Sequence, residues 1–389
     1  MKRNLSDEEA NFLGRRINKK FDGKKNATYT LKDHEWEKIQ DLRNKGVLNS
    51  CTNLEVDPTT VKHLWKKTKN ESVFVKNPLF VEQQEKSFDD ILKDFDNRIN
   101  TIVEKSVKRS KIEPKTIKTS FLFDVAVYTD VHTAMNPNPN GFSLYGGKWD
   151  AEEIDSRNDI FVSKVLENKK ANKLIIFDLG DLMDGWDGQT VRKGHELPQN
   201  MSNEEAFDVA LDFKIKQIDL LAKDYEEIEI ININDDNHSG AFSYVVNSAF
   251  KRFIEQRYSN VKVINQRKFI DHYIYGNKVF VATHGKDGKN LKFGFKPKLD
   301  PIQIEKIDNY LAENDLIRKN LEVYFIKGDS HQDIFDNSTA QNFKYWNFPA
   351  FSPSSNWVQT NFKKGVSGFY TFNFEENTYH PHPYYFKWK

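Results

Sequence analysis

Cysteine is almost absent from this sequence: Cys51 is the only one among 389 residues. A single thiol excludes an internal disulfide and a zinc–thiolate cluster, and it favours a reducing, cytoplasmic compartment. No apolar run approaches 18 residues, so no membrane span is expected. The first residues are charged and lack an apolar stretch, so we expect no signal peptide either.

A net charge of one sign is also lacking, since the chain carries a formal charge of only +1. With 38% hydrophobic and 13% aromatic residues, it can bury a sizeable core despite 30% charged residues. Its length allows two or three domains. The most basic stretch covers residues 105–118, and we interpret it as a solvated linker. Contact with phosphates is the alternative, and it requires a second signal.

The N-terminal region shows helical patterns. We expect a short helix over Glu8–Lys19, a helix over Leu31–Arg43, a short one over Ser50–Val56, and a third over Pro58–Lys67 that begins after an Asp-Pro pair. The last two resemble a helix-turn-helix, although Glu55 stands near the place of the usual turn glycine. The residues that would then face DNA are Thr59, Thr60, Lys62, His63 and Lys66. A small helical domain that packs on a neighbour is the alternative.

From residue 121 onward, short apolar runs alternate with helical patterns, and Tyr275-Gly276-Asn277 predicts a hairpin turn. This alternation predicts an α/β domain of layered mixed β-sheets flanked by helices. The expected strands are Phe121–Tyr128, Leu174–Phe177, Ile228–Ile233, Val261–Ile264, Phe269–Tyr275, Val279–Ala282, Val323–Ile326 and Gly368–Phe374. The expected helices are Arg157–Lys170, Glu204–Lys223, Ala241–Tyr258 and Ile302–Lys319, preceded by an amphipathic helix over Phe88–Val103.

Five of these strands end in Asp, Asn or His. In α/β sheets, ligands gather at the carboxyl ends of strands, so these side chains are expected to meet. One such ending carries little meaning, but five in order indicate a metal site. The strand ends supply Asp130 and His132; Asp181 and Asp184; Asn237 and His238; His284; and Asp329 and His331. We interpret Asp178, Asp187 and Asp235 as solvated or structural.

This order of motifs over residues 121–335 resembles the calcineurin-like metallophosphoesterase superfamily: Asp-x-His, Gly-Asp-x-x-Asp, Asn-His, His, and a final Gly-x-x-His. The sequence departs from the pattern at three positions. Asp236 stands where a glycine is usual, Ser239 stands where an acid is usual, and Asp329 replaces a histidine. A carboxylate at position 329 is a harder ligand, which favours Mn²⁺ or Mg²⁺.

The resemblance implies two divalent metal ions, with Mn²⁺ favoured and Mg²⁺ as the alternative. It implies that Asp130, His132 and His331 hold one ion, that Asn237, His284 and Asp329 hold the other, and that Asp181 bridges both. His238 would protonate the leaving group, and Asp184 would orient a ligand. The expected reaction is attack of a metal-bound hydroxide on a phosphodiester.

The segment 237–286 looks like a phage-encoded branch related to DNA-repair exonucleases, which often carries an N-terminal helix-turn-helix. We therefore predict a helix-turn-helix-like domain over 1–70, a basic connector over 71–120 and a metallophosphoesterase domain over 121–389. The predicted function is a DNA nuclease in the cytoplasm, that of the host if the chain is phage-encoded, and a homodimer is expected by analogy. A DNA-binding scaffold with a degenerate site and a phosphomonoesterase acting on protein or nucleotide remain alternatives.

Aromatic residues are dense near the C-terminus. Core or dimer packing is the favoured interpretation, and base stacking is the alternative. These residues are Tyr345, Trp346, Phe348, Phe351, Trp357, Phe362, Phe369, Tyr370, Phe372 and Phe374.

Overall fold

The chain divides into two compact units, Met1–Lys86 and Ser87–Lys389. The predicted three-part division stays a prediction. The computed structural model describes residues 2–13, 26–45, 63–67, 72–76, 97, 108, 110, 112–139, 141, 147–191, 195–285, 297–318, 320–355, 358 and 365–387. The predicted helices over 50–56 and 88–103 lie outside this range, except that Asn97 is helical.

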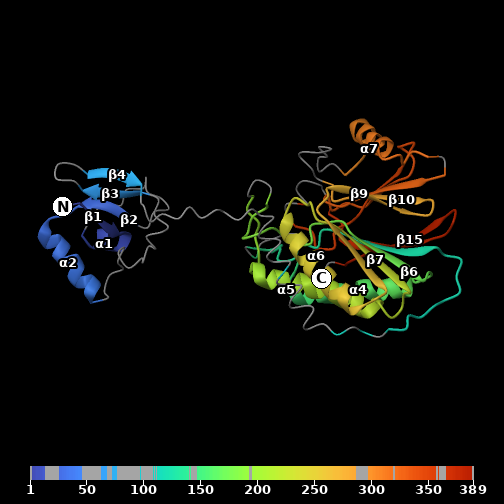
Figure 1. Ribbon diagram of the computed structural model, residues 1–389, viewed down its shortest axis with the longest axis horizontal. Coiled ribbons are helices and arrows are strands. Elements are labelled where there is room, and N and C mark those ends of the chain that lie inside the picture. The colour runs from blue at the N-terminus through green and yellow to red at the C-terminus, as the bar shows by residue number, and fades with distance from the viewer. Residues whose placement is uncertain are drawn as a thin grey trace. The chain divides into compact units, whose positions relative to one another are not determined.

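Among its described residues, the N-terminal unit contains two two-stranded sheets and two helices (Figure 1). Apolar side chains of its first half form a small buried cluster that includes Leu5, Leu31 and Ile39. The elements are β1 (Lys2–Ser6), α1 (Asp7–Phe12), β2 (Asn26–Thr30), α2 (Asp33–Asn44), β3 (His63–Lys67) and β4 (Ser72–Lys76). The helix predicted over 31–43 is confirmed, and the one over 8–19 is observed as α1, which ends at Phe12.

The helix predicted over Pro58–Lys67 is wrong in its second half, because His63–Lys67 is strand β3. This segment pairs antiparallel with β4, so that Leu64 lies opposite Val75 and Trp65 opposite Phe74. Aromatic residues, which occur in both segments, and β-branched residues, which occur in β4, have a higher propensity for strands than for helices. Lys66 therefore belongs to a strand. His63 belongs to the same strand, whereas Thr59, Thr60 and Lys62 lie outside the described residues.

The C-terminal unit is built on two mixed sheets. The six-stranded sheet has the order β15-β14-β5-β6-β7-β8, and the five-stranded sheet has the order β12-β13-β11-β10-β9. Strands β5 to β8 run parallel, as do β10 and β11, whereas β9 and β10 form the predicted antiparallel hairpin. The strands are β5 (Phe123–Tyr128), β6 (Lys173–Asp178), β7 (Glu227–Ile233), β8 (Val261–Gln266), β9 (Ile270–Tyr275), β10 (Lys278–Thr283), β11 (Glu322–Lys327), β12 (Ile334–Asp336), β13 (Lys344–Asn347), β14 (Gly368–Phe374) and β15 (Tyr379–Tyr385).

Helices cover the outer faces of both sheets. Three helices share a buried cluster with the six-stranded sheet: α4 (Ala151–Glu167), α5 (Asn203–Leu221) and α6 (Ala241–Arg257). Helix α7 (Pro301–Glu313) packs on the five-stranded sheet. A third cluster joins the inner faces of the two sheets. The unit is thus layered as helix, sheet, sheet, helix, with α4 to α6 and α7 on opposite sides (Figure 1). The predicted fold class is confirmed.

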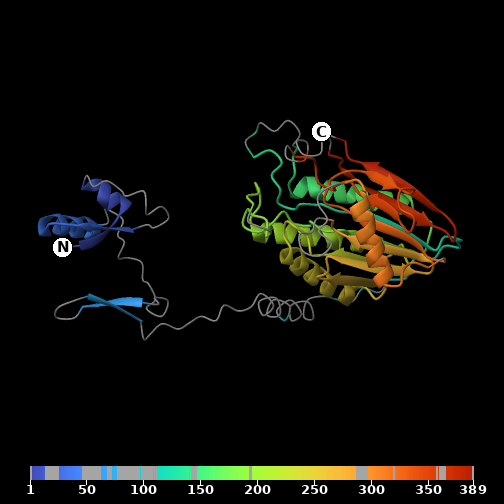
Figure 2. The same cartoon turned by 90° about the horizontal axis from the view of Figure 1, so that it is seen from above.

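Most of the C-terminal aromatic residues belong to this core. Those that the structure describes as buried are Tyr345, Trp346, Phe348, Phe351, Phe369, Tyr370, Phe372 and Phe374. Trp346 and Phe372 stack across the seam between the sheets, with ring centroids 5.0 Å apart. The view from above shows β14 and β15 (red) along one edge of the unit (Figure 2). The core interpretation is therefore confirmed for these residues, whereas Trp357 and Phe362 lie outside the described range.

Among the described residues, every helix is too short or too polar to cross a membrane.

Candidate metal centre

The carboxyl ends of five strands meet at one place in the C-terminal unit. Three of them, β5, β6 and β7, are adjacent parallel strands of the six-stranded sheet, and two, β10 and β11, are adjacent parallel strands of the other sheet. Because parallel strands end at the same edge of a sheet, side chains that follow them come together. The structure thereby brings together carboxylates and imidazoles that are far apart in the sequence, such as those of Asp130 and His331.

Asp130, His132 and His331 form the first group. The Nε2 atom of His331 lies 3.3 Å from Asp130 Oδ1 and 3.2 Å from His132 Nε2. His132 Nε2 lies 3.6 Å from the same Asp130 oxygen. All three side chains are buried, and their ligand atoms are close enough to hold one ion. The other oxygen of Asp130 accepts hydrogen bonds from the Thr129 hydroxyl and from the Asp329 backbone N–H, which fixes the carboxylate.

Asp181 lies between the histidines of both sheets. Its Oδ2 atom is 3.1 Å from His284 Nε2, 3.8 Å from His238 Nε2 and 3.9 Å from His132 Nε2. Asp181 therefore belongs to two further groups that could hold a metal, one with His132 and His238 and one with Asp130 and His284. This shared position is the one expected of a bridging carboxylate.

The residues expected at the second ion are His284, Asp329 and Asn237. His284 Nδ1 lies 2.9 Å from the Leu179 carbonyl oxygen, so this nitrogen carries the proton and Nε2 faces Asp181. Asp329 Oδ1 lies 3.8 Å from His284 Nε2. The neighbours of Asn237 both contact Asp181: the His238 N–H points at Oδ1, and the Asp236 carboxylate accepts from the Asp181 N–H. Asn237 therefore lies between two residues that are hydrogen-bonded to Asp181.

Several acceptor atoms of the centre are buried without a hydrogen-bond partner among the described residues. They include Asp130 Oδ1, Asn237 Oδ1 and Asp329 Oδ2. Buried polar atoms are normally paired, so this set requires an electrophilic partner. Carboxylate, amide and imidazole donors of this kind are ligands of divalent metal ions in proteins. The residues present therefore fit a divalent metal ion.

The electrostatics of the centre agree with this requirement. Burial alone would raise the pKa of Asp130, but His331 and His132 hold it well below the usual range for a carboxyl group. Burial would lower the pKa of His284, yet Asp181 raises that pKa to about 10. In the absence of a metal, a proton thus supplies positive charge among these carboxylates. A bound divalent ion would supply that charge instead.

The backbone is strained at the ligands. Five of the eight non-glycine residues that have a positive φ in the described chain belong to the metal groups: Asp130, His132, Asp181, Asp329 and His331. Aspartate tolerates the left-handed region better than most residues, but histidine rarely adopts it. Such conformations cluster at functional sites, where the surrounding structure holds them in place.

Two glycines allow the strand ends to approach. A Cβ atom at Gly180, where φ is 103°, would lie 3.0 Å from His284 Nδ1. A Cβ atom at Gly328 would lie 2.0 Å from Thr129 Oγ1 and 2.8 Å from Asp130 Oδ2. Both contacts join the two sheets. The glycines of the Gly-Asp motifs therefore permit close packing at the centre.

Asp184 joins two histidines from different segments. Its Oδ1 atom lies 3.0 Å from His132 Nδ1 and 2.9 Å from His238 Nδ1. Both rings are thereby oriented with Nε2 toward Asp181. Burial would raise the pKa of Asp184, but hydrogen bonds with His132 and His238 lower it. The carboxylate can thus stabilise positive charge on His238, whose own pKa Asp181 raises against the effect of burial.

Two residues at the centre were not identified from the sequence. Asp236 is buried and accepts hydrogen bonds from the N–H groups of Ser239 and Gly240, so it shapes the turn that carries Asn237. Lys327, at the end of β11, is only 2% exposed, and its Nζ lies 3.2 Å from the position that a Cβ atom at Gly285 would take. The Lys-Gly-Asp-Ser-His run offered a signal for Lys327, since a strand that ends in lysine beside two ligands places a cation there.

Other acidic residues have structural or surface roles. Asp178 receives the buried ammonium group of Lys214 at 2.6 Å, as the structural interpretation expects. Asp187 and Asp235 are exposed.

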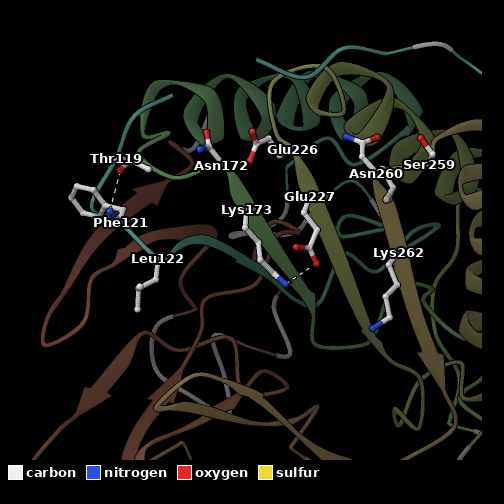
Figure 3. A pocket seen from close by; sticks show the side chains of 11 residues that line it. Thr119, Phe121, Leu122, Asn172, Lys173, Glu226, Glu227, Ser259, Asn260 and Lys262 are labelled. Carbon is white, nitrogen blue, oxygen red and sulfur yellow. Dashed lines mark hydrogen bonds and ion pairs between the residues drawn. The ribbon is translucent and has the colours of Figure 1, made fainter. Parts of the chain in front are cut away.

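A cavity of about 770 Å³ lies at the opposite edge of the six-stranded sheet, where β6, β7 and β8 begin (Figure 3). Two of its charged side chains, Lys173 and Glu227, form an ion pair at 2.7 Å. None of the metal-centre residues lines it.

No protein-family model matches the chain, and no curated protein matches it. Among solved structures, it is similar to a predicted phosphoesterase from Streptococcus pneumoniae TIGR4, with 10% identity, a TM-score of 0.28, and coverage of 67% of this chain and 88% of that one. It is also similar to a single mutant of Vps29 from Entamoeba histolytica, with 11% identity, a TM-score of 0.29 and coverage of 68% and 99%. A 5′-nucleotidase from Candida albicans SC5314 shows 12% identity and a TM-score of 0.33, over 70% of this chain and 53% of that one. At these scores, the interpretation of the site rests on its geometry.

Proposed function

We propose that this chain is a dinuclear-metal phosphodiesterase that hydrolyses DNA, with a preference for Mn²⁺. The observation that carries the proposal is the convergence of side chains from five strand ends around Asp181, with buried acceptor atoms that require a cation. Asp130, His132 and His331 would hold one ion, and Asn237, His284 and Asp329 the other. Two divalent ions about 3.5–4 Å apart can clamp a phosphate and activate a water molecule for in-line attack.

The protein's own residues supply orientation and a proton. His238 lies 3.8 Å from Asp181, and Asp184 fixes its ring through Nδ1. His238 could also serve as a ligand, because its Nε2 belongs to one of the metal-binding groups. Its side chain is 23% exposed, however, whereas those of His132 and His284 are 3% and 0% exposed. We therefore assign His238 to the leaving oxygen, to which it would donate the Nε2 proton.

Lys327 would hold a phosphate oxygen. Buried lysines need a partner, and Lys214 and Lys278 have carboxylates at 2.6 and 2.5 Å. Within the described part of the chain, Lys327 has no such ion pair, although Asp329 and Asp130 act on it electrostatically. An ammonium group in this position is suited to an anionic substrate.

DNA is proposed as the substrate because of the sequence resemblance and the basic run over 105–118. The decisive experiment measures Mn²⁺-dependent cleavage of plasmid DNA and of bis-p-nitrophenyl phosphate by the full chain. Asp181→Asn and His132→Ala are each expected to lower cleavage by more than about 100-fold, since even residues that only support a ligand cost 10- to 100-fold. Asp235→Asn, an exposed control in the same loop as Asn237, should retain full activity.

Each other outcome selects a different function. If Asp181→Asn cleaves as fast as the wild type, the catalytic proposal is wrong. Salt-sensitive DNA binding without turnover under any metal would identify a scaffold. Hydrolysis of p-nitrophenyl phosphate without hydrolysis of diesters would identify a phosphomonoesterase.

A further inference from the structure

The metal centre is open to solvent at His238. The side chain of His238 is 23% exposed, whereas those of Asp181, Asp329 and His331 are only 2%, 5% and 8% exposed. A substrate group that does not enter the centre must therefore pass beside His238. The surface next to this residue decides what that group can be.

Two large apolar side chains lie exposed in the segment that borders His238. Trp186 is 48% exposed and Val191 is 53% exposed. The Val191 N–H donates to the His238 carbonyl oxygen at 2.9 Å, so the two segments are hydrogen-bonded at this point. Trp186 packs edge to face against Phe242, near the start of α6, with ring centroids 4.8 Å apart and planes at 89°. The indole thus stands where the segments leading from Asp184 and from His238 meet.

The loop that carries Trp186 is tightly held. Trp186 and Gln189 exchange two backbone hydrogen bonds, of 2.9 and 3.0 Å. The side chain of Gln199 accepts from the Gly188 N–H and donates to the Asp184 carbonyl. A half-exposed tryptophan on a fixed turn contributes little to the core, but it offers a flat ring face at low cost in conformational entropy.

The geometry points to a base-stacking subsite: we propose that Trp186, backed by Phe242, receives a nucleobase of the substrate while the neighbouring phosphate occupies the metal centre. Two residues of extended chain span at most about 7 Å, so the Cα atom of Trp186 lies within that distance of the Cα atom of Asp184. This is within the span of one nucleotide. Stacking on an indole is tolerant of base identity, so the subsite would favour a nucleotide chain without selecting its sequence.

The inference rests on the proposed phosphodiesterase function. Two diesters with the same leaving group distinguish a failure of the stacking subsite from a failure of the proposed function. Thymidine 5′-(p-nitrophenyl phosphate) carries a base, whereas methyl p-nitrophenyl phosphate carries none. Trp186→Ala is expected to raise KM for the thymidine ester about 5- to 150-fold with little change in kcat, which corresponds to the loss of one stacked base. It should leave kcat/KM for the methyl ester within about twofold. Trp186→Phe should restore most of the loss, because it keeps an aromatic face.

The control is Ile302→Ala, which removes another exposed apolar side chain, 63% exposed, on α7. It should affect neither ester. Equal losses on both esters, or no loss on the thymidine ester, would overturn the stacking proposal. If the wild type cleaves neither ester, the proposed function fails, and stacking is then measured by the affinity for oligo-dT of wild type and Trp186→Ala. Unchanged affinity there would again overturn it.

Discussion

Replacement of Asp184 by asparagine tests how the protein orients its metal-centre histidines. One carboxylate oxygen faces His132 at 3.0 Å and His238 at 2.9 Å. A charge-assisted hydrogen bond contributes about 1–1.5 kcal/mol more than a neutral one. Asparagine keeps the shape but loses the charge, so the two contacts together should cost about 2–3 kcal/mol. This corresponds to a roughly 30- to 150-fold loss in kcat/KM.

The loss should divide between two measurements. His132 is a predicted ligand, so its share should appear as weaker Mn²⁺ binding in a calorimetric titration. His238 is the proposed proton donor, so its share should appear as a lower kcat at saturating Mn²⁺. Asp235→Asn provides the matched control, because Asp235 is exposed. If Asp184→Asn behaves like this control in both measurements, Asp184 does not orient the histidines and the assigned roles are wrong.

Three further predictions follow from contacts of the same unit. Gly328→Ala places a Cβ atom 2.0 Å from Thr129 Oγ1. This clash should lower the free energy of unfolding, measured in denaturant melts, by about 1–3 kcal/mol, and it should also lower the metal content of the protein. An unchanged metal content would contradict this prediction. Glu322→Gln leaves the buried Lys278 without a carboxylate and should cost about 1–3 kcal/mol at pH 7. Burial would raise the pKa of Glu322, but its lysine partners lower that pKa below 4.5. The difference in unfolding free energy between variant and wild type should therefore shrink as the pH falls below 4.5. A constant difference in denaturant melts from pH 7 to pH 3 would contradict this prediction. Lys327→Met should weaken inhibition by inorganic phosphate about 10- to 100-fold without changing the metal content, and an unchanged inhibition constant would exclude phosphate binding by this lysine.

Much of the C-terminal unit could be predicted because its strands are continuous apolar runs. Parallel strands that are buried on both faces have such continuous apolar sequences, and the polar residues that follow them belong to the candidate metal centre. Strand β15 was missed, since Pro381 and Pro383 interrupt its pattern; proline is tolerated there because β15 is an edge strand. The division into two sheets was also not visible, because no local pattern reports which strands pair.

The site could be predicted by residue type but not by arrangement. Motif order placed Asp181 among the ligands, whereas the link from Asp184 to both histidines depends on the packing of three segments. Lys327 was missed although it precedes two expected ligands, because a lysine at a strand end is ordinarily solvated and its burial is visible only in the structure. The helix over 58–67 was predicted from the spacing of apolar residues within that segment. This local pattern carries no information about the pairing of β3 with β4.

The origin of the ligands gives the metal centre a mechanical consequence. Asp130, Asp181 and Asn237 follow strands of one sheet, whereas His284, Asp329 and His331 follow strands of the other. Ions bound there would link the two sheets, which are otherwise held together by apolar packing between their inner faces. Chelation should then loosen the seam while each sheet keeps its own hydrogen bonds. The metal centre would therefore stabilise the packing of the two sheets as well as support catalysis. The stability of the C-terminal unit would then depend on the concentration of the metal ion.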